Sequence, residues 1–234
     1  MRVKLIFFVC VISAGMIQAQ ETGLAGIPSD NFIQYYLRGA GTYSALYSGK
    51  SETPYDKQFA NNPYFESDTY ILGTLCYNRV VYRDVMMRFD LFRNELTVYK
   101  PNKSGFTVLN NEKFEYAILN GTTIIMSAGE QDSKNKFLVL LQNGTYPIVR
   151  KYNVKTTEDT KSGWVIRSFS TQKQYAIYVN GVPHTVKNKN NVLKLFPDRR
   201  KELNEFAKLY KLNFKAQIEQ SIMALVNHYE SLIK

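Results

Sequence analysis

The chain has 234 residues, of which 30 are Lys or Arg and 20 are Asp or Glu, and it contains two cysteines and two histidines. This length suits one domain, or one domain with a short appendage. The motifs H-E-x-x-H, C-x-x-C and G-x-S-x-G, the P-loop and the dinucleotide fingerprint are all missing from the sequence, so the enzyme classes they mark are not expected.

Residues 1–19 have the features of a secretory signal peptide. Arg2 and Lys4 form a basic head, an apolar run follows from Leu5 to Ile17, and Ala19 precedes the expected cleavage point. The run is shorter than the about 20 apolar residues that span a bilayer. We therefore expect export, which argues against a nucleic-acid partner in spite of the basic charge.

Loss of the signal peptide also removes Cys10 and leaves Cys76 as the only cysteine. An intramolecular disulfide is then impossible, and Cys76 is predicted to be a small buried residue in a strand. An intermolecular disulfide is the alternative.

Residues 20–68 are predicted to form an irregular arm, because glycines and prolines interrupt any periodicity. One short helix is expected near Asp30–Leu37, with Asp30 as its cap. The many tyrosines indicate that the arm packs onto another part of the chain.

Residues 69–186 are predicted to be a β domain of roughly eight to ten strands. Asn-Gly pairs at Asn120-Gly121 and Asn143-Gly144 lie between apolar runs, and Asn78-Arg79 is a third two-residue turn candidate. The predicted strands are Tyr70–Tyr77, Val80–Phe92, Leu96–Lys100, Phe114–Leu119, Thr122–Ser127, Phe137–Gln142, Thr145–Lys155, Trp164–Ser170 and Gln174–Val179. Residues 102–110 are expected to be a loose connection.

Residues 187–234 are predicted to be helical. The expected helices are Asn190–Phe196, Pro197–Tyr210 and Phe214–Ile233, and the last carries an apolar stripe at helical spacing. We expect them to pack on the β domain as a lid. The predicted fold class is thus α+β, mainly β: an antiparallel meander, either a sandwich or an open barrel, with a C-terminal helical hairpin.

The strand Val80–Phe92 carries the candidate site. Alternation places Tyr82, Asp84, Arg88 and Asp90 on one face. Two carboxylates beside an arginine indicate either a polar binding surface or an acid/base pair, which in a glycosidase stands about 5–10 Å apart. A cross-strand charge ladder is the structural alternative, and we favour it.

Neither the two histidines nor the basic C-terminal residues indicate a catalytic or metal site. His184 is expected in a loop and His228 beside the apolar stripe of the last helix, with no supporting motif for catalysis. Basic residues are densest from Lys187 to Lys215, which is typical of a solvated basic face and leaves only a weak case for docking on an anionic membrane surface. No metal or cofactor is expected.

Several short motifs resemble a family of exported Bacteroidetes proteins of unsettled function. They include Asn62-Pro63-Tyr64-Phe65, Val81-Tyr82-Arg83-Asp84-Val85, Arg88-Phe89-Asp90, Leu193–Lys201 and Ala224–Tyr229. The resemblance implies a Gram-negative envelope location, a β-rich body and a basic helical C-terminus, and it brings no catalytic residues with it.

The functional hypothesis is a non-catalytic exported protein, in the periplasm or associated with the outer membrane. It would serve as a binding or accessory module for another envelope protein or a glycan. The alternative is a hydrolase that acts on carbohydrate or peptide through carboxylates such as Asp84 and Asp90.

Overall fold

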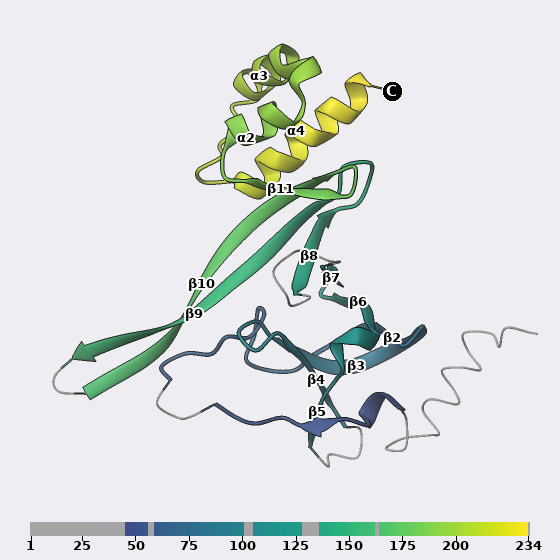
Figure 1. Ribbon diagram of the computed structural model, residues 1–234, viewed down its shortest axis with the longest axis vertical. Helices are drawn as coiled ribbons and strands as arrows, with labels where there is room; N and C mark the ends of the chain where they lie inside the picture. The colour runs from purple at the N-terminus through teal and green to yellow at the C-terminus, as the bar shows by residue number, and fades with distance from the viewer. Residues whose placement is uncertain (1–44, 56–58, 101–104, 128–135, 162–163, 234) are drawn as a thin grey trace, which may run out of the picture.

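A computed structural model describes residues 45–55, 59–100, 105–127, 136–161 and 164–233. The expected signal peptide and the helix expected at 30–37 lie outside the described residues. The described chain forms one antiparallel sheet of eleven strands, in the order β1-β5-β4-β3-β2-β6-β7-β8-β9-β10-β11, with helices at one end (Figure 1). The sheet does not close, and the fold is α+β, mainly β.

The strands agree with most of the predicted runs. Their bounds are β1 Lys50–Ser51, β2 Ile71–Tyr77, β3 Val80–Asp90, β4 Glu95–Tyr99, β5 Phe106–Val108, β6 Phe114–Leu119, β7 Thr122–Met126, β8 Phe137–Gln142, β9 Ile148–Lys161, β10 Trp164–Val179 and β11 Val182–Val186. Short 3-10 turns occur at Ala45–Tyr47, Asn111–Lys113 and Pro197–Arg199. The helices are α2 Lys189–Leu195, α3 Arg200–Leu209 and α4 Ile218–Leu232.

Tight two-residue turns join the neighbouring strands of three hairpins. Asn78 and Arg79 have φ of 53° and 64° between β2 and β3, and Asn120-Gly121 has φ of 47° and 76° between β6 and β7. Two successive positive φ values define the type I′ turn, whose twist matches that of the strands it joins. The sequence predicted these two turns correctly.

Three strands were missed. β1 and β5 are short, and β5 lies within the connection expected to be loose. β11 pairs with β10 and places His184 opposite Ile177, so the loop location expected for His184 is wrong. The cause is the Asn180-Gly181 turn, with φ of 52° and 78°, which reverses the chain into a further strand.

β9 and β10 form a long two-stranded ribbon that runs diagonally across the molecule in Figure 1. The prediction of two separate strands, Trp164–Ser170 and Gln174–Val179, is wrong, because β10 is continuous from Trp164 to Val179. The polar residues between them are exposed on both faces, and backbone pairing with β9 carries the strand through.

The helices form a hydrophobic core of their own with the near end of the ribbon. Ile222, Leu225 and Val226 of α4 are fully buried against residues of β9–β11 such as Ile177 and Val186. His228 lies at the edge of this core, where its ring stacks on Phe206 at 4.0 Å between centroids.

A second core lies within β2–β8. Leu75, Met87, Phe89 and Leu96 are its fully or almost fully buried centre, and the arm contributes Leu46 to it. This cluster contains no residue of the helices, so the helices cover the ribbon end of the sheet and are not a lid on the larger β core. Within the described part of the chain, every helix is too short or too polar to cross a membrane.

Candidate functional site

The four predicted site residues do not share one face. Tyr82 is buried in the larger core beside Val85, whereas Arg88 and Asp90 contact the arm. The reason is a bulge, at which two residues of β3, Arg83 and Asp84, oppose a single residue of β2. A bulge shifts the alternation by one residue, so the assignment of Tyr82 to the face of Arg88 and Asp90 is wrong. Asp84 itself has a φ of 55° and is exposed.

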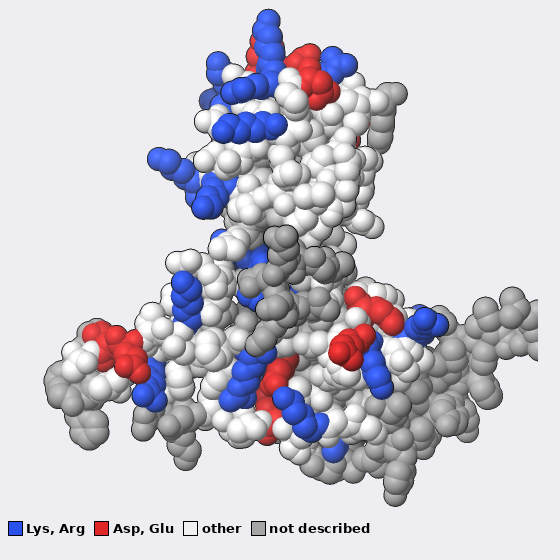
Figure 2. Space-filling model, in the orientation of Figure 1, with Lys and Arg blue, Asp and Glu red and all other residues white. Residues whose placement is uncertain are grey.

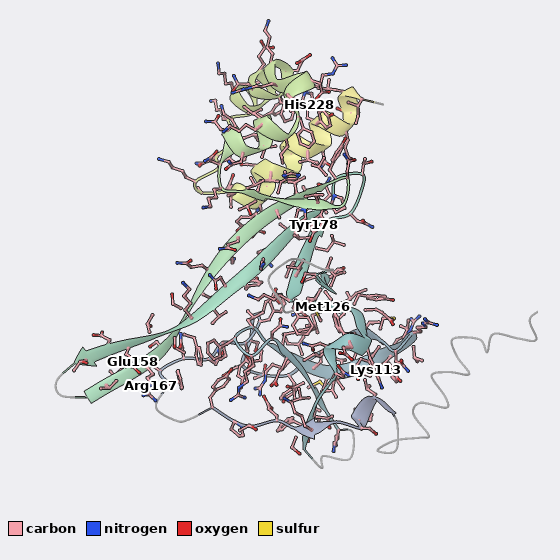
Figure 3. The ribbon with its side chains drawn as sticks, viewed as in Figure 1. Lys113, Met126, Glu158, Arg167, Tyr178 and His228 are labelled. Carbon is pink, nitrogen blue, oxygen red and sulfur yellow. The ribbon has the colours of Figure 1, made fainter. Side chains whose placement is uncertain are left out.

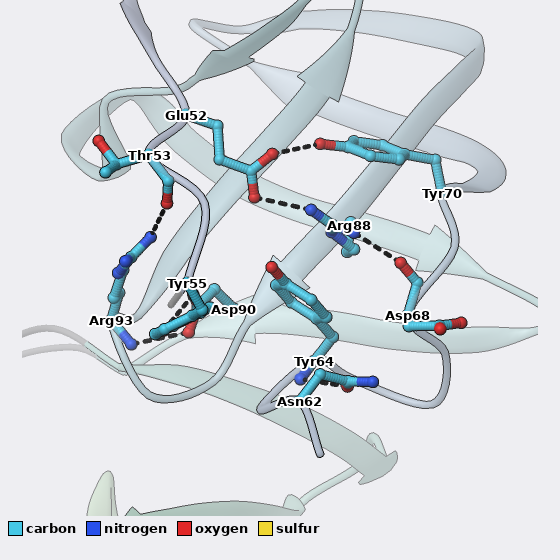
Figure 4. Close-up of polar contacts among 10 residues, drawn as sticks. All are labelled: Glu52, Thr53, Tyr55, Asn62, Tyr64, Asp68, Tyr70, Arg88, Asp90 and Arg93. Carbon is cyan, nitrogen blue, oxygen red and sulfur yellow. Dashed lines mark hydrogen bonds and ion pairs between the residues drawn. The ribbon is translucent and has the colours of Figure 1, made fainter. Parts of the chain in front are cut away.

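Arg88 fastens the arm to β3 (Figure 4). Its guanidinium donates to Glu52 Oε1 at 2.7 Å and to the carbonyl of Asp68. The same group lies over the rings of Tyr64 and Tyr70, at 3.8 and 4.5 Å from their centroids. Ion pairing and cation–π contact therefore hold two arm segments around one side chain.

The tyrosines of this cluster remain protonated. Burial, and then the hydrogen bond that Tyr70 donates to Glu52 at 2.7 Å, raise the pKa of Tyr70. Burial also raises the pKa of Tyr64, although the positive charge of Arg88 opposes that shift. These phenols thus act as neutral hydrogen-bond donors and as rings that bind the Arg88 cation, and both contacts help to hold the arm against β3.

Asp90 organises the turn that follows β3. Its side chain accepts hydrogen bonds from the backbone N–H groups of Phe92 and Arg93, at 2.9 and 2.8 Å, and from the Tyr55 hydroxyl at 2.6 Å. Burial raises the pKa of Asp90, and these hydrogen bonds and Arg93 lower it in part. Arg93 also lies over the Tyr55 ring at 3.9 Å.

The contacts of Asp90 are those of a structural carboxylate. A general acid or base must present an oxygen to its substrate, whereas both oxygens of Asp90 already accept hydrogen bonds from Tyr55 or the turn backbone. Asp90 thereby fixes the start of the turn that continues through Arg93-Asn94-Glu95.

That turn forms one wall of an open groove of about 590 Å³. The opposite walls come from the chain before β1 and from the segment after β5. The lining residues are Ser48, Gly49, Lys50, Arg93, Asn94, Glu95, Val108, Leu109, Asn110, Asn111 and Glu112. A smaller hollow of about 280 Å³ extends it, sharing Lys50, Arg93, Glu95 and Val108.

Gly49 allows the two sides of the groove to approach. A Cβ at this position would lie 2.5 Å from the carbonyl oxygen of Val108, a distance that no side chain tolerates. The same Cβ would lie 2.7 Å from Thr107 Cγ2, so glycine lets the chain that enters β1 lie this close to β5.

The groove lining is polar and balanced in charge. Lys50 and Arg93 stand against the carboxylates of Glu95 and Glu112, and Lys50 Nζ pairs with Glu95 Oε1 at 2.6 Å. The lining thus offers hydrogen-bond donors and acceptors without an excess of either sign of charge. Figure 2 shows the same mixture of red and blue over the β body, whereas Lys and Arg predominate at the helical end.

Asn111 is the distinctive residue of the groove. Its Nδ2 donates to the carbonyl oxygen of Asn94 at 2.7 Å, and Asn94 Oδ1 in turn accepts from the backbone N–H of Phe137 at 3.0 Å. The Oδ1 of Asn111 is buried and has no hydrogen-bond partner within the described chain. A buried carbonyl oxygen without a donor costs about 1–3 kcal/mol, so a small shift of the Asn111 side chain that brought this oxygen to a donor of a ligand in the groove would be favourable.

The groove was not predicted. Its walls come from three segments brought together by the pairing of β1 with β5 and of β5 with β4. The available signal was two polar clusters, Arg93-Asn94-Glu95 and Asn110-Asn111-Glu112, which sequence alone marks only as turns.

Cys76 is buried in β2, in agreement with the prediction. Its Sγ donates to Glu115 Oε2 at 2.6 Å. Burial, and then this hydrogen bond, raise the pKa of the thiol to about 12. Among the described residues, no group of three or more His, Cys, Asp or Glu side chains is arranged to hold a metal ion.

Comparisons with known proteins add no relative. No protein-family model matches the chain, and neither a curated protein nor a solved structure is significantly similar to it.

Proposed function

We propose that the protein is a non-catalytic binding module of the bacterial envelope, exported by its signal peptide, and that it binds a neutral glycan in the groove. The observation that carries this proposal is the groove lining itself, with its balanced charges and the unpaired buried oxygen of Asn111.

The chemistry of the lining favours a hydroxyl-rich ligand. A sugar hydroxyl both donates and accepts, and the groove offers amide and carboxylate acceptors next to amide, ammonium and guanidinium donors. An acidic polysaccharide would meet the two carboxylates as well as the two cations, and it would gain no net attraction. An apolar ligand would find only Val108 and Leu109, which are buried.

The contacts of Asp90 support the proposal that the protein is not an enzyme. The alternative is a hydrolase that works through Asp84 and Asp90, and it requires both carboxylates to reach one bond of a substrate. Asp90 is 2% exposed and is hydrogen-bonded to Tyr55 and the turn, while Asp84 lies at the bulge.

An array of neutral oligosaccharides and peptidoglycan fragments tests the proposal. We expect the protein to retain at least one neutral glycan, and Asn111→Leu to lose that binding. Asn111→Leu also removes the hydrogen bond from Asn111 Nδ2 to the carbonyl oxygen of Asn94, so we expect it to lower the unfolding free energy by about 0.5–1.5 kcal/mol. Circular dichroism checks that the variant is folded under the conditions of the array. Gln172→Leu, an exposed amide of β10, is the matched control and should bind normally.

Two outcomes would contradict glycan binding without catalysis. Capture of envelope proteins with no glycan retained would favour the protein-partner form of the module. Release of cleaved sugar or peptide that stops in Asp90→Asn would favour the hydrolase.

A further inference from the structure

The outer half of the β9–β10 ribbon extends beyond both cores. β8 pairs with β9 only as far as Lys151, and β11 pairs with β10 only from Tyr175. Beyond these points the two strands continue side by side, and Figure 3 places Glu158 and Arg167 near the tip, far from His228. A two-stranded ribbon alone is at best marginally stable in water, whereas three or more strands support one another.

The two edges of this outer ribbon differ. The arm occupies part of the β10 edge, where Phe59 bridges Arg167 and the side chain of Asn61 exchanges two hydrogen bonds with the backbone of Phe169. On the β9 edge, no strand in the described part of the chain pairs with residues 153–161. This edge is long, and residues 155–160 are exposed.

The sequence of this edge suits strand pairing. Val154, Thr156, Thr157 and Thr160 are β-branched residues, which favour strands. Strand edges are templates for the addition of another strand.

The charges of the edge are complementary to those of a second copy. In a two-fold antiparallel pair, each residue faces one of the same parity, so the pairing must be centred on a single residue. Centring on Thr157 places Lys155 opposite Asp159 of the second copy, twice. Centring on Lys155, Glu158 or Asp159 places a charge opposite itself, and centring on Thr156 pairs no opposite charges directly along Lys155–Asp159. Centring on Thr160 places Asp159 opposite Lys161, but because β9 ends at Lys161 only residues 159–161 of the strand would then pair, whereas centring on Thr157 pairs all of residues 153–161.

We propose that two copies of the protein associate through their β9 edges, antiparallel and centred on Thr157, to form a continuous four-stranded sheet β10-β9-β9-β10. The two Lys155–Asp159 pairs set the register, and the added strands support each ribbon. This interface is separate from the groove, so the test of dimerisation is independent of the test of glycan binding.

Charge exchange tests the register. We expect sedimentation equilibrium of the purified protein to show a dimer at concentrations on the order of 100 µM. Lys155→Glu and Asp159→Lys should each weaken the dimer about tenfold or more, because each variant creates two like-charged pairs. The double variant Lys155→Glu/Asp159→Lys restores opposite charges and should dimerise like the wild type.

Cysteine cross-linking gives a second, geometric measurement. Directly opposite residues lie about 4.5–5.5 Å apart between Cα atoms, within disulfide range. Thr157→Cys should therefore form a disulfide-linked dimer on mild oxidation. Thr156→Cys, its neighbour, should not, because in this register its copies are farther apart than the about 7 Å that a disulfide can bridge.

Three results would overturn the proposal: a monomer at all these concentrations, a dimer indifferent to the single charge reversals, or preferential cross-linking through position 156. Circular dichroism of each variant checks that its sheet is intact.

Discussion

Arg88 shows how a single residue can be prominent in the sequence for a structural reason. It lies within the charged strand that suggested a site, and in the structure it binds Glu52, Tyr64 and Asp68 of the arm and Tyr70 just before β2. The side chains of Arg88 and Glu52 are 15% and 9% exposed, so their pairing is largely shielded from solvent.

We predict that Arg88→Met lowers the unfolding free energy by about 2 kcal/mol. Removing one partner of a buried ion pair costs about 3–5 kcal/mol, and proximity to solvent reduces that figure. Arg167→Met is the control, because its pair with Glu158 is 44% and 59% exposed and should be worth about 0–1 kcal/mol. Equal losses of unfolding free energy for the two variants in urea denaturation would contradict a stabilising role of the Arg88 contacts with the arm.

Cys76 gives a pH-dependent prediction. Its pKa is raised from 9.0 to about 12, chiefly by burial, so its thiolate fraction at pH 8 is roughly a thousandth of that of an ordinary thiol. We expect alkylation of the native protein at pH 8 to be correspondingly slow.

The raised pKa of the Cys76 thiol also makes the folding stability depend on pH. The folded state holds the Cys76 proton above pH 9, so the stabilisation is complete below pH 9 and is lost as pH rises from 9 to about 12. Glu115→Gln should lower the thiol pKa, because it removes a negative charge and a strong acceptor. Alkylation rates measured against pH check this, and a native thiol that titrates near 9 would contradict it.

At the scale of elements, the turns decide how the strands meet. Arg79 occupies a left-handed position with φ of 64°, where a non-glycine residue costs about 1 kcal/mol. Its side chain is exposed, and its backbone N–H donates to Glu115 Oε1 at 2.9 Å.

We therefore predict that Arg79→Gly stabilises the protein by about 0.5–1 kcal/mol, because glycine adopts this conformation without strain and the backbone hydrogen bond is kept. Arg79→Val should destabilise it. Thermal unfolding of both variants is the measurement, and destabilisation by glycine would contradict the account.

Elements with local signals were predictable from the sequence, and those that depend on distant pairing were not. Asn120-Gly121 carries its turn in its own residue types, so β6 and β7 were found. The residues between Ser170 and Gln174 are polar because both faces of the ribbon are exposed, and the missing alternation was mistaken for a break.

The candidate site illustrates the same limit. Arg88 and Asp90 were correctly placed on one face of the strand, but the bulge at Asp84 moved Tyr82 to the core. Glu52 and Asn111 take their roles from contacts with residues 36 and 17 positions away, respectively, which no local pattern reveals.

At the scale of the molecule, the ribbon joins two cores that share few residues. The helical core contains Leu225 and the β core contains Leu75, each with 0% exposure. Their separation means that damage to one core need not spread to the other.

We predict that Leu225→Ala and Leu75→Ala each cost about 2–5 kcal/mol, as buried leucines do. Hydrogen exchange should accelerate in α2–α4 and β11 for Leu225→Ala, and in β2–β8 for Leu75→Ala. Acceleration spread evenly over the chain in both variants would show a single cooperative core instead.

An NMR titration of the isotope-labelled protein with a glycan retained on the array distinguishes binding in the groove from turnover. If the groove binds without turnover, chemical-shift changes are confined to residues 48–50, 93–95 and 108–112, and the glycan is unchanged over days. Changes centred on the ribbon or the helices, or new resonances from a cleaved sugar, would contradict it.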